Sequence, residues 1–207
     1  IHSESSGQTF EVTDPSLITP EPLYFELGGL VQVDNLRTIL SAVRLLREQG
    51  VAIPEEALRK GFREVTRMTG LRGRWEILSE HPTLICDTAH NEDGIRYVVR
   101  QLVALGRPLH LIFGMVSDKD VRGVLALLPQ SAKYYFTAAR VSRALAPEEL
   151  RELAQAYGLC GEVYPSIREA LAAAQSAAQP DTDVVFVGGS NFLIADLLAI
   201  QSTNNDK

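Results

Sequence analysis

The sequence predicts an α/β fold: a doubly wound, mostly parallel sheet over residues 74–207, preceded by the end of another domain over residues 1–73. In the second segment, short apolar strands alternate with helices. Strands that are apolar without interruption are buried on both faces, which is typical of parallel sheets covered by helices. The chain begins at Ile1, and residues 8–12 already alternate like a strand. We therefore expect the sequence to be a piece of a longer protein.

Composition excludes several classes of protein. The 207 residues are 45% hydrophobic and 22% charged, with a formal net charge of −6, which argues against a general nucleic-acid binder. Cys86 and Cys160 are too few for a disulfide scaffold and fit a reducing cytoplasm. No apolar run approaches the roughly 18 residues of a membrane span, and no signal peptide is evident. We expect a cytoplasmic monomer with small-molecule partners and neither nucleic acid nor membrane.

The first segment shows a strand-then-helix pattern. Two short strands are predicted over 9–12 and 23–27. A helix follows, because apolar residues share one face, and it stops near Gly50. A second helix is predicted from Pro54, a favoured first-turn residue. Residues 66–74 are polar and basic with two glycines, and predict a linker.

The second segment repeats strand and helix in turn. Strands are predicted over 83–86, 109–113, 134–136, 163–164 and 184–187. Helices are predicted around 95–102, stopping at Gly106, and over 121–128, 147–157, 166–178 and 191–200, with a fraying tail.

Polar residues follow the carboxyl ends of these strands. They are Asp87 to Asn91, Gly114 to Asp120, Thr137 to Arg140 and Gly188 to Asn191. Ligands bind beyond this edge of an open doubly wound sheet. The sequence therefore predicts a ligand site there.

Single residues at this edge each allow two interpretations. Asp87 accepts hydrogen bonds from a ribose or caps the following helix, and spacing alone does not separate the two. His90 donates to a carboxylate or phosphate, or bonds to backbone within its loop. Ser190, after two glycines, binds an anion at a helix N-terminus or forms a tight turn. Lys119 lies in an Asp-Lys-Asp run that as a bare tripeptide is a solvated turn.

Two candidates lie in the first segment and its linker. Arg74 either neutralises phosphate or solubilises the linker, and Asn35 either caps its helix or contacts a ligand. The phosphate-binding pattern GxxxxGK[ST] is absent from the sequence.

Several blocks in order form a recognisable pattern. They are Leu71 to Glu76 (LRGRWE), Ile85 to Asn91 (ICDTAHN), Phe113-Gly114 with Asp118-Lys119-Asp120, and Phe186 to Ser190 (FVGGS). This pattern resembles the C-terminal part of the folylpolyglutamate synthase/dihydrofolate synthase family, in the ATP-dependent Mur ligase superfamily. The helix after Gly28-Gly29, with Gln32 and Asn35, resembles the end of that family's central ATPase domain.

The resemblance implies a Rossmann-like C-terminal domain and a defined chemistry. ATP would activate a dihydropteroate or folate carboxylate as an acyl phosphate, and the amine of L-glutamate would form an amide. By matching position, Asn35, Arg74 and Asp87 would contact ATP, while His90, Ser190 and Lys119 would hold glutamate. The phosphate-binding loop and the Mg²⁺ ligands would lie upstream of Ile1. The resemblance therefore implies no metal site in this chain, no catalytic residue of its own, and no ligation by the chain alone.

Two rival functions remain open from sequence, and a third is disfavoured. One is a peptidoglycan-precursor or cyanophycin-type ligase of the same superfamily. Another is a non-enzymatic nucleotide-binding module. A nicotinamide-dependent oxidoreductase is disfavoured, because G-x-G-x-x-G does not follow the first strand of the α/β segment.

Overall fold

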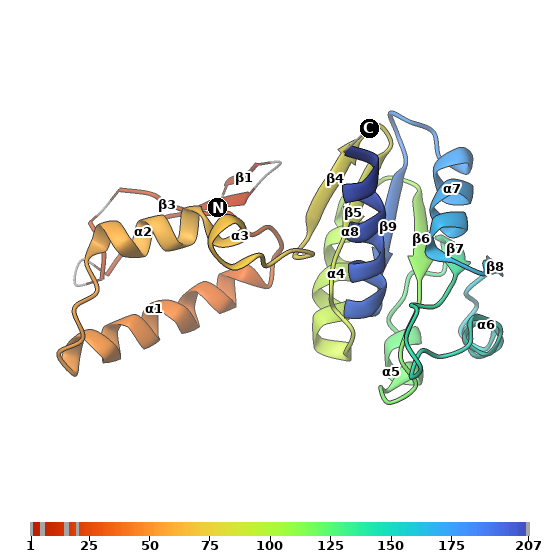
Figure 1. Cartoon of the computed structure of the whole chain (residues 1–207), viewed down its shortest axis with the longest axis horizontal. Coiled ribbons are helices and arrows are strands. Elements are labelled where there is room, and N and C mark those ends of the chain that lie inside the picture. The colour runs from red at the N-terminus through yellow and green to blue at the C-terminus, as the bar shows by residue number, and fades with distance from the viewer. Residues whose placement is uncertain (1, 5–6, 15–16, 20, 206–207) are drawn as a thin grey trace. The chain divides into compact units, whose positions relative to one another are not determined.

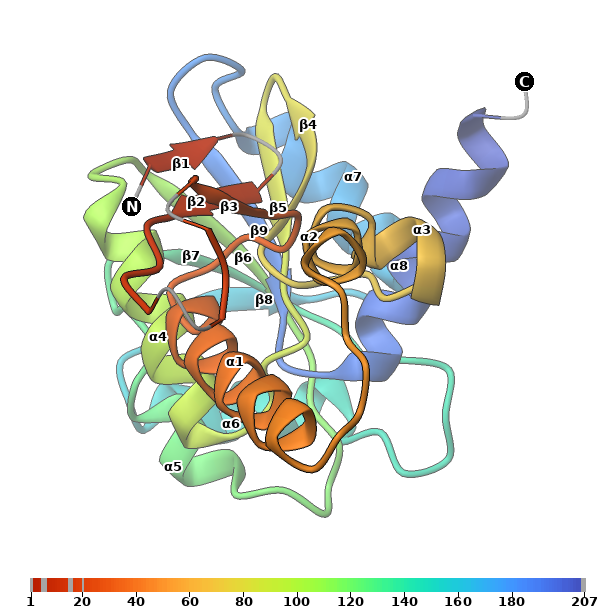
Figure 2. The same cartoon turned by 90° about the vertical axis from the view of Figure 1, so that its left-hand side faces the viewer.

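The chain folds into two compact units, Ile1–Glu76 and Ile77–Lys207. The computed structural model describes residues 2–4, 7–14, 17–19 and 21–205. Within that described part, no helix is both long and apolar enough to cross a membrane. The two units are drawn in Figures 1 and 2.

The first unit packs helices against a three-stranded sheet. Its elements are β1 (His2–Glu4), β2 (Gly7–Phe10), β3 (Leu23–Phe25), α1 (Gln32–Glu48), α2 (Glu55–Arg63) and α3 (Val65–Thr69). Both strand pairs, β1 with β2 and β2 with β3, are antiparallel. One hydrophobic core joins β2, β3, α1 and α2. Within it, the rings of Phe25 and Phe62 pack edge to face with their centres 5.0 Å apart. Figure 2 shows α1 and α2 beside these strands.

The prediction of a linker over residues 66–74 is wrong for residues 66–69. Residues 65–69 form α3, which ends at Gly70 in the left-handed conformation with φ 71°. The carboxylate of Glu26 accepts a hydrogen bond from the Thr66 backbone N–H at 2.7 Å, which satisfies a free donor in the first turn. This contact joins residues forty apart, so local polarity did not reveal it.

The second unit is an α/β sheet of six strands in the order β4-β5-β9-β6-β7-β8. The strands are β4 (Glu76–Glu80), β5 (Thr83–Cys86), β6 (Leu109–Phe113), β7 (Lys133–Phe136), β8 (Gly161–Val163) and β9 (Val184–Gly188). The helices are α4 (Glu92–Ala104), α5 (Val121–Leu125), α6 (Pro147–Gln155), α7 (Ile167–Ala177) and α8 (Asn191–Asn205). From β5 to β8 every neighbouring pair is parallel, which confirms the predicted doubly wound fold.

Two of the differences from the predicted elements concern β4 and the end of α8. Strand β4 was not predicted, because its residues are only half-buried and lack a continuous apolar run. Helix α8 runs to Asn205, beyond the predicted end at Ile200 and into the tail that was expected to fray.

Apolar layers lie on both faces of the sheet. Alternate residues of β5, β6, β7 and β9, including Ile112 and Val187, pack with α7 and α8 in one core. The intervening residues, such as Leu111 and Phe186, face the other side and are also buried. Figure 1 shows α7 and α8 against the sheet. Burial on both faces explains why the sequences of these strands are unbroken runs of apolar residues.

A buried polar cluster lies near the amino ends of the strands. Nε2 of His110 is 3.1 Å from the Asp183 carboxylate, and Nδ1 is 2.9 Å from the Tyr135 hydroxyl. Backbone N–H of Gln179 and the Thr182 hydroxyl also donate to Asp183, at 3.0 and 2.7 Å. These bonds, with the one from Gln179 largest, lower the pKa of Asp183 below its ordinary value.

Asp183→Asn should therefore matter most at neutral pH and least in acid. Because the folded pKa is lowered, the ionised carboxylate stabilises the fold above the unfolded value of about 4, and this is lost as pH falls through the folded pKa. The difference in free energy of unfolding between wild type and Asp183→Asn should shrink from pH 6 to pH 3, measured by urea denaturation. Asp181→Asn, at a side chain 85% exposed, is the matched control and should show no such trend. A constant difference for Asp183→Asn would contradict the assignment.

Candidate active site

The carboxyl ends of β5, β9 and β6 meet at one edge of the sheet. The Asp87 N–H donates to the Val187 carbonyl at 3.1 Å, and the Gly114 N–H donates to that of Gly188 at 3.4 Å. Strand β9 lies between β5 and β6, so the turn after β9 is flanked by the turns after both neighbours. The predicted convergence of polar loops is therefore present in the second unit.

Glycine is required at this edge for close backbone packing. Gly189 has φ 94°, and a Cβ there would lie 2.7 Å from the Gly114 carbonyl oxygen. A Cβ on Gly114 would overlap the Thr137 carbonyl oxygen. The loops after β9, β6 and β7 therefore pack closely through their backbones, and glycine is needed at both positions.

Asp87 is buried and does not cap α4. Its Oδ1 accepts from the Ala89 N–H at 2.8 Å, while the cap of α4 is Asn91, which accepts from the Gly94 N–H at 2.9 Å. The capping interpretation of Asp87 is therefore wrong. A buried carboxylate at the end of a parallel strand is consistent with nucleotide contact.

His90 and Lys119 line the same surface depression. This depression, of about 380 Å³, is formed by the start of α4 together with Lys119 and Asp120. His90 Nδ1 lies 2.9 Å from the Thr88 carbonyl oxygen, so the predicted contact between this ring and the backbone of its loop is present. Asp120 accepts from the Gly123 N–H at 2.9 Å and so caps α5, which makes the Asp-Lys-Asp run a structured turn.

Ser190 stands at the start of α8. It is 3% exposed, and its Oγ accepts from the Phe192 N–H at 3.2 Å. The residue therefore forms the tight turn that one interpretation predicted, and it also places its hydroxyl at a helix N-terminus. Backbone N–H groups and the helix dipole favour an anion at such a position.

Asn35 and Arg74 belong to the first unit. Asn35 lies inside α1, where Nδ2 donates to the buried Gln32 at 2.9 Å. The residue before α1 is Val31, so the capping interpretation of Asn35 is wrong.

Arg74 lies in a tightly shaped turn. Gly73 and Trp75 on either side both have positive φ, 72° and 48°. The Glu76 carboxylate accepts from the Gly73 N–H at 2.8 Å and pairs with Arg72. Arg72 is thus held within the turn, and Arg74 is half-buried between two residues of restricted backbone.

Two buried hydroxyls near the site were missed as candidates. Oγ1 of Thr88 and Oγ1 of Thr137 have no hydrogen-bond partner among the residues that the structure describes. Both residues follow strands of the parallel sheet, which is the signal that could have identified them. Buried hydroxyls without partners are costly, so a ligand or water is expected to satisfy them.

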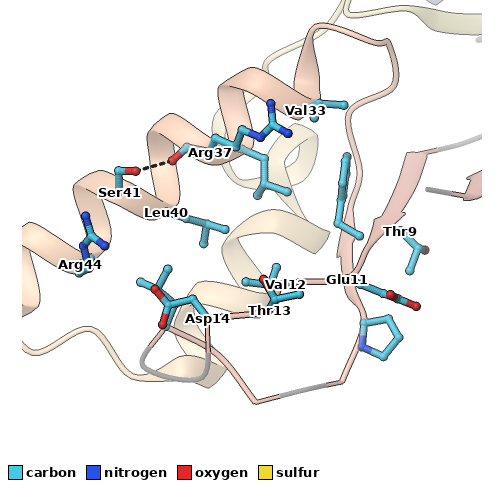
Figure 3. Close-up of a pocket in the computed structure, with 14 residues that line it drawn as sticks. Thr9, Glu11, Val12, Thr13, Asp14, Val33, Arg37, Leu40, Ser41 and Arg44 are labelled. Carbon is cyan, nitrogen blue, oxygen red and sulfur yellow. Dashed lines mark hydrogen bonds between the residues drawn. The ribbon is translucent and has the colours of Figure 1, made fainter.

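A separate cavity of about 640 Å³ lies in the first unit (Figure 3). Helix α1 and residues 9–14 form its walls, with Leu40 inside and Arg37 and Arg44 along the helix. None of the six predicted site residues lines this cavity. Local sequence patterns did not predict this cavity, because its walls come from β2, the loop after it and α1, which are separate segments of the chain.

Comparison with known proteins agrees with this architecture. The model of the family "Mur ligase, glutamate ligase domain" matches residues 73–191. The dihydrofolate synthase/folylpolyglutamate synthase of Escherichia coli K12 is 33% identical over 175 residues, covering 83% of this chain and 38% of the relative.

Two solved structures are also similar. Mycobacterium tuberculosis folylpolyglutamate synthase complexed with ADP and AMPPCP has a TM-score of 0.75 at 26% identity, covering 95% of this chain and 45% of that one. A bifunctional folylpolyglutamate synthase/dihydrofolate synthase with Mn, AMPPNP and L-glutamate bound has a TM-score of 0.70 at 26% identity, with coverage of 88% and 42%.

This chain spans less than half the length of the relatives it matches. The resemblance to folylpolyglutamate synthase/dihydrofolate synthase that the sequence motifs indicated is confirmed. By the match over residues 73–191, more than half of its length, the chain belongs to the Mur ligase family through the glutamate ligase domain.

Proposed function

We propose that the intact protein is an ATP-dependent ligase that joins L-glutamate to dihydropteroate or folate. The observation that carries this proposal is the convergence of Asp87, His90, Lys119 and Ser190 on the carboxyl edge of a glutamate ligase domain. We assign residues 74–207 to that domain and residues 1–73 to the end of a central ATP-binding domain.

The proposed reaction has two steps, phosphoryl transfer and amide formation. The γ-phosphoryl group of ATP passes to a carboxylate oxygen of the pteroate or folate, which yields an acyl phosphate and ADP. The glutamate amine then attacks the acyl carbon, phosphate leaves, and the nitrogen loses a proton as the amide forms. Both steps depend on positioning and on stabilising negative charge.

The proposed nucleotide-binding residues are Asp87, Arg74 and Asn35. The Asp87 carboxylate suits ribose hydroxyls, because it is buried and an ionised acceptor forms strong hydrogen bonds. Arg74 supplies positive charge for the phosphates, and the Asn35 amide offers both a donor and an acceptor.

Glutamate contacts fall to Ser190, His90 and Lys119. The start of α8 suits a carboxylate, and Lys119 and His90 both line the depression at the start of α4. Two separate cationic or donor regions match the two carboxylates of the amino acid.

Mg²⁺ is proposed as the divalent cation, with its ligands outside this chain. The described residues contain no group of three or more His, Cys, Asp or Glu side chains that could hold a metal. The cation would neutralise phosphate charge during transfer.

The rival within the superfamily is a peptidoglycan-precursor ligase. The relatives described above are folate ligases, which favours a pteroate acceptor.

We also propose a cytoplasmic location. Free thiols at Cys86 and Cys160 are consistent with it.

The test is ADP release by the full-length parent. We expect release to require both L-glutamate and a dihydropteroate or reduced folate, and not to occur with UDP-muramyl substrates. The isolated 207-residue chain should show no ligation. Release with UDP-muramyl substrates alone would favour the rival ligase, and release with neither would favour a nucleotide-binding module. Ligation by the isolated chain would contradict the placement of the catalytic groups upstream.

A further inference from the structure

The loop after β7 is fixed to the loop after β6 by backbone contacts. The Ser117 N–H donates to the Arg143 carbonyl at 3.0 Å, and the Leu145 N–H donates to that of Met115 at 2.9 Å. Val116 and Ala144 form an isolated antiparallel bridge between them. Arg143 is therefore held at the carboxyl edge of the sheet by main-chain bonds that do not use its side chain.

The Arg143 guanidinium is oriented by two further groups. Nη1 lies 3.2 Å from an Asp118 carboxylate oxygen, and Cζ lies 4.7 Å from the centre of the Phe192 ring. A guanidinium carries five N–H donors in a planar fork. The Asp118 contact is made by Nη1, and the side chain remains 52% exposed. Donors are therefore left for a ligand from solvent.

These two contacts place Arg143 between the proposed glutamate contacts. Phe192 lies in the first turn of α8, where its N–H bonds to Ser190. Asp118 immediately precedes Lys119, which lines the depression beside His90. The guanidinium thus lies next to the start of α8 on one side and the Asp-Lys-Asp turn on the other.

We propose that Arg143 is a further substrate-binding residue, which binds a carboxylate of the amino-acid substrate together with the start of α8. This inference rests on the proposed function. Guanidinium groups match carboxylates with two parallel hydrogen bonds, and the helix N-terminus adds favourable dipoles. Phe192 and Asp118 hold the side chain in one orientation, which reduces the entropy lost on binding.

A purely structural role explains the side chain less well. The loop is already fixed through its backbone, and an exposed ion pair such as Arg143 with Asp118 contributes little stability. The charge lies against Phe192 in the first turn of α8 and against Asp118, the residue before Lys119, which is a position that suits a carboxylate site.

The experiment uses the full-length parent at saturating ATP and folate, with glutamate varied. Arg143→Gln should raise the KM for glutamate about tenfold, since removing a charge-assisted hydrogen bond costs on the order of one decade in affinity. kcat at saturating glutamate and KM for ATP should stay close to wild type. Arg143→Lys should recover part of the affinity, because it keeps the charge but loses the planar fork.

Arg140→Gln is the matched control. Arg140 is an exposed arginine of the same loop whose backbone N–H, rather than its side chain, bonds to Asp196 at 2.9 Å. This variant removes the same charge and should leave the KM for glutamate unchanged.

Two outcomes would overturn the inference. One is an Arg143→Gln enzyme with an unchanged KM for glutamate. The other is an equal rise in Arg140→Gln, which would mean a general charge effect. If wild type shows no glutamate-dependent turnover, the proposed function fails first and the inference falls with it. Normal wild-type turnover with an unaffected Arg143→Gln refutes the inference alone.

Discussion

Asp87→Asn in the full-length parent should lower kcat/KM for ATP about 10- to 100-fold. Asp87 is buried at the end of β5, where an ionised acceptor is proposed to bond the nucleotide. Losing a hydrogen bond to a charged group costs about 1.5–3 kcal/mol, and each 1.4 kcal/mol is a tenfold change. Steady-state ADP release with ATP varied measures the effect.

Asparagine separates nucleotide binding from loop structure. Asp87 also accepts from the Ala89 N–H at 2.8 Å, and the Oδ1 of asparagine can accept the same bond. The loop should therefore keep its shape while the charge is lost. Asp181→Asn, which removes an exposed charge that lies 3.1 Å from the His81 ring, should leave turnover unchanged. Full activity in a folded Asp87→Asn enzyme would show that Asp87 only shapes its loop.

Gly189→Ala should destabilise the second unit by about 2–5 kcal/mol. A left-handed conformation costs a residue with a Cβ roughly 1–2 kcal/mol, and overpacking adds typically 1–3 kcal/mol. Gly189 has φ 94°, and its Cβ would lie 2.7 Å from the Gly114 carbonyl oxygen and 2.8 Å from the Phe113 ring. The melting temperature should fall by roughly 5–15 °C, measured by calorimetry.

Gly106→Ala separates backbone strain from steric overlap. Gly106 has φ 62°, but no atom lies within 4 Å of its Cβ position. Only the conformational cost of about 1 kcal/mol applies there, so the loss should be clearly smaller. Equal losses at the two positions would show that close packing under Ser190 contributes nothing.

The fold class and most elements of the second unit were predictable from sequence. Unbroken apolar runs such as 109–113 and 184–187 predicted buried parallel strands, and each is a strand in the structure. The apolar pattern of a helix or of a buried strand lies within a short stretch of consecutive residues, so it can be recognised from sequence alone. Strand β4 lacks that signal, and α3 depends on a contact from Glu26, forty residues away in sequence.

The sequence by itself determined which residues follow the carboxyl ends of the strands, and hence that Asp87, His90, Lys119 and Ser190 are candidates. Their roles, like those of Asn35 and Arg74, stay predictions. The tertiary structure alone decided that β9 enters between β5 and β6, that Asn91 rather than Asp87 caps α4, and that Arg143 lies beside Phe192. The physical reason is that strand order, capping partners and ring contacts depend on which distant segments pair. Local spacing does not specify those pairings, because they are set by packing of the whole sheet and its helices.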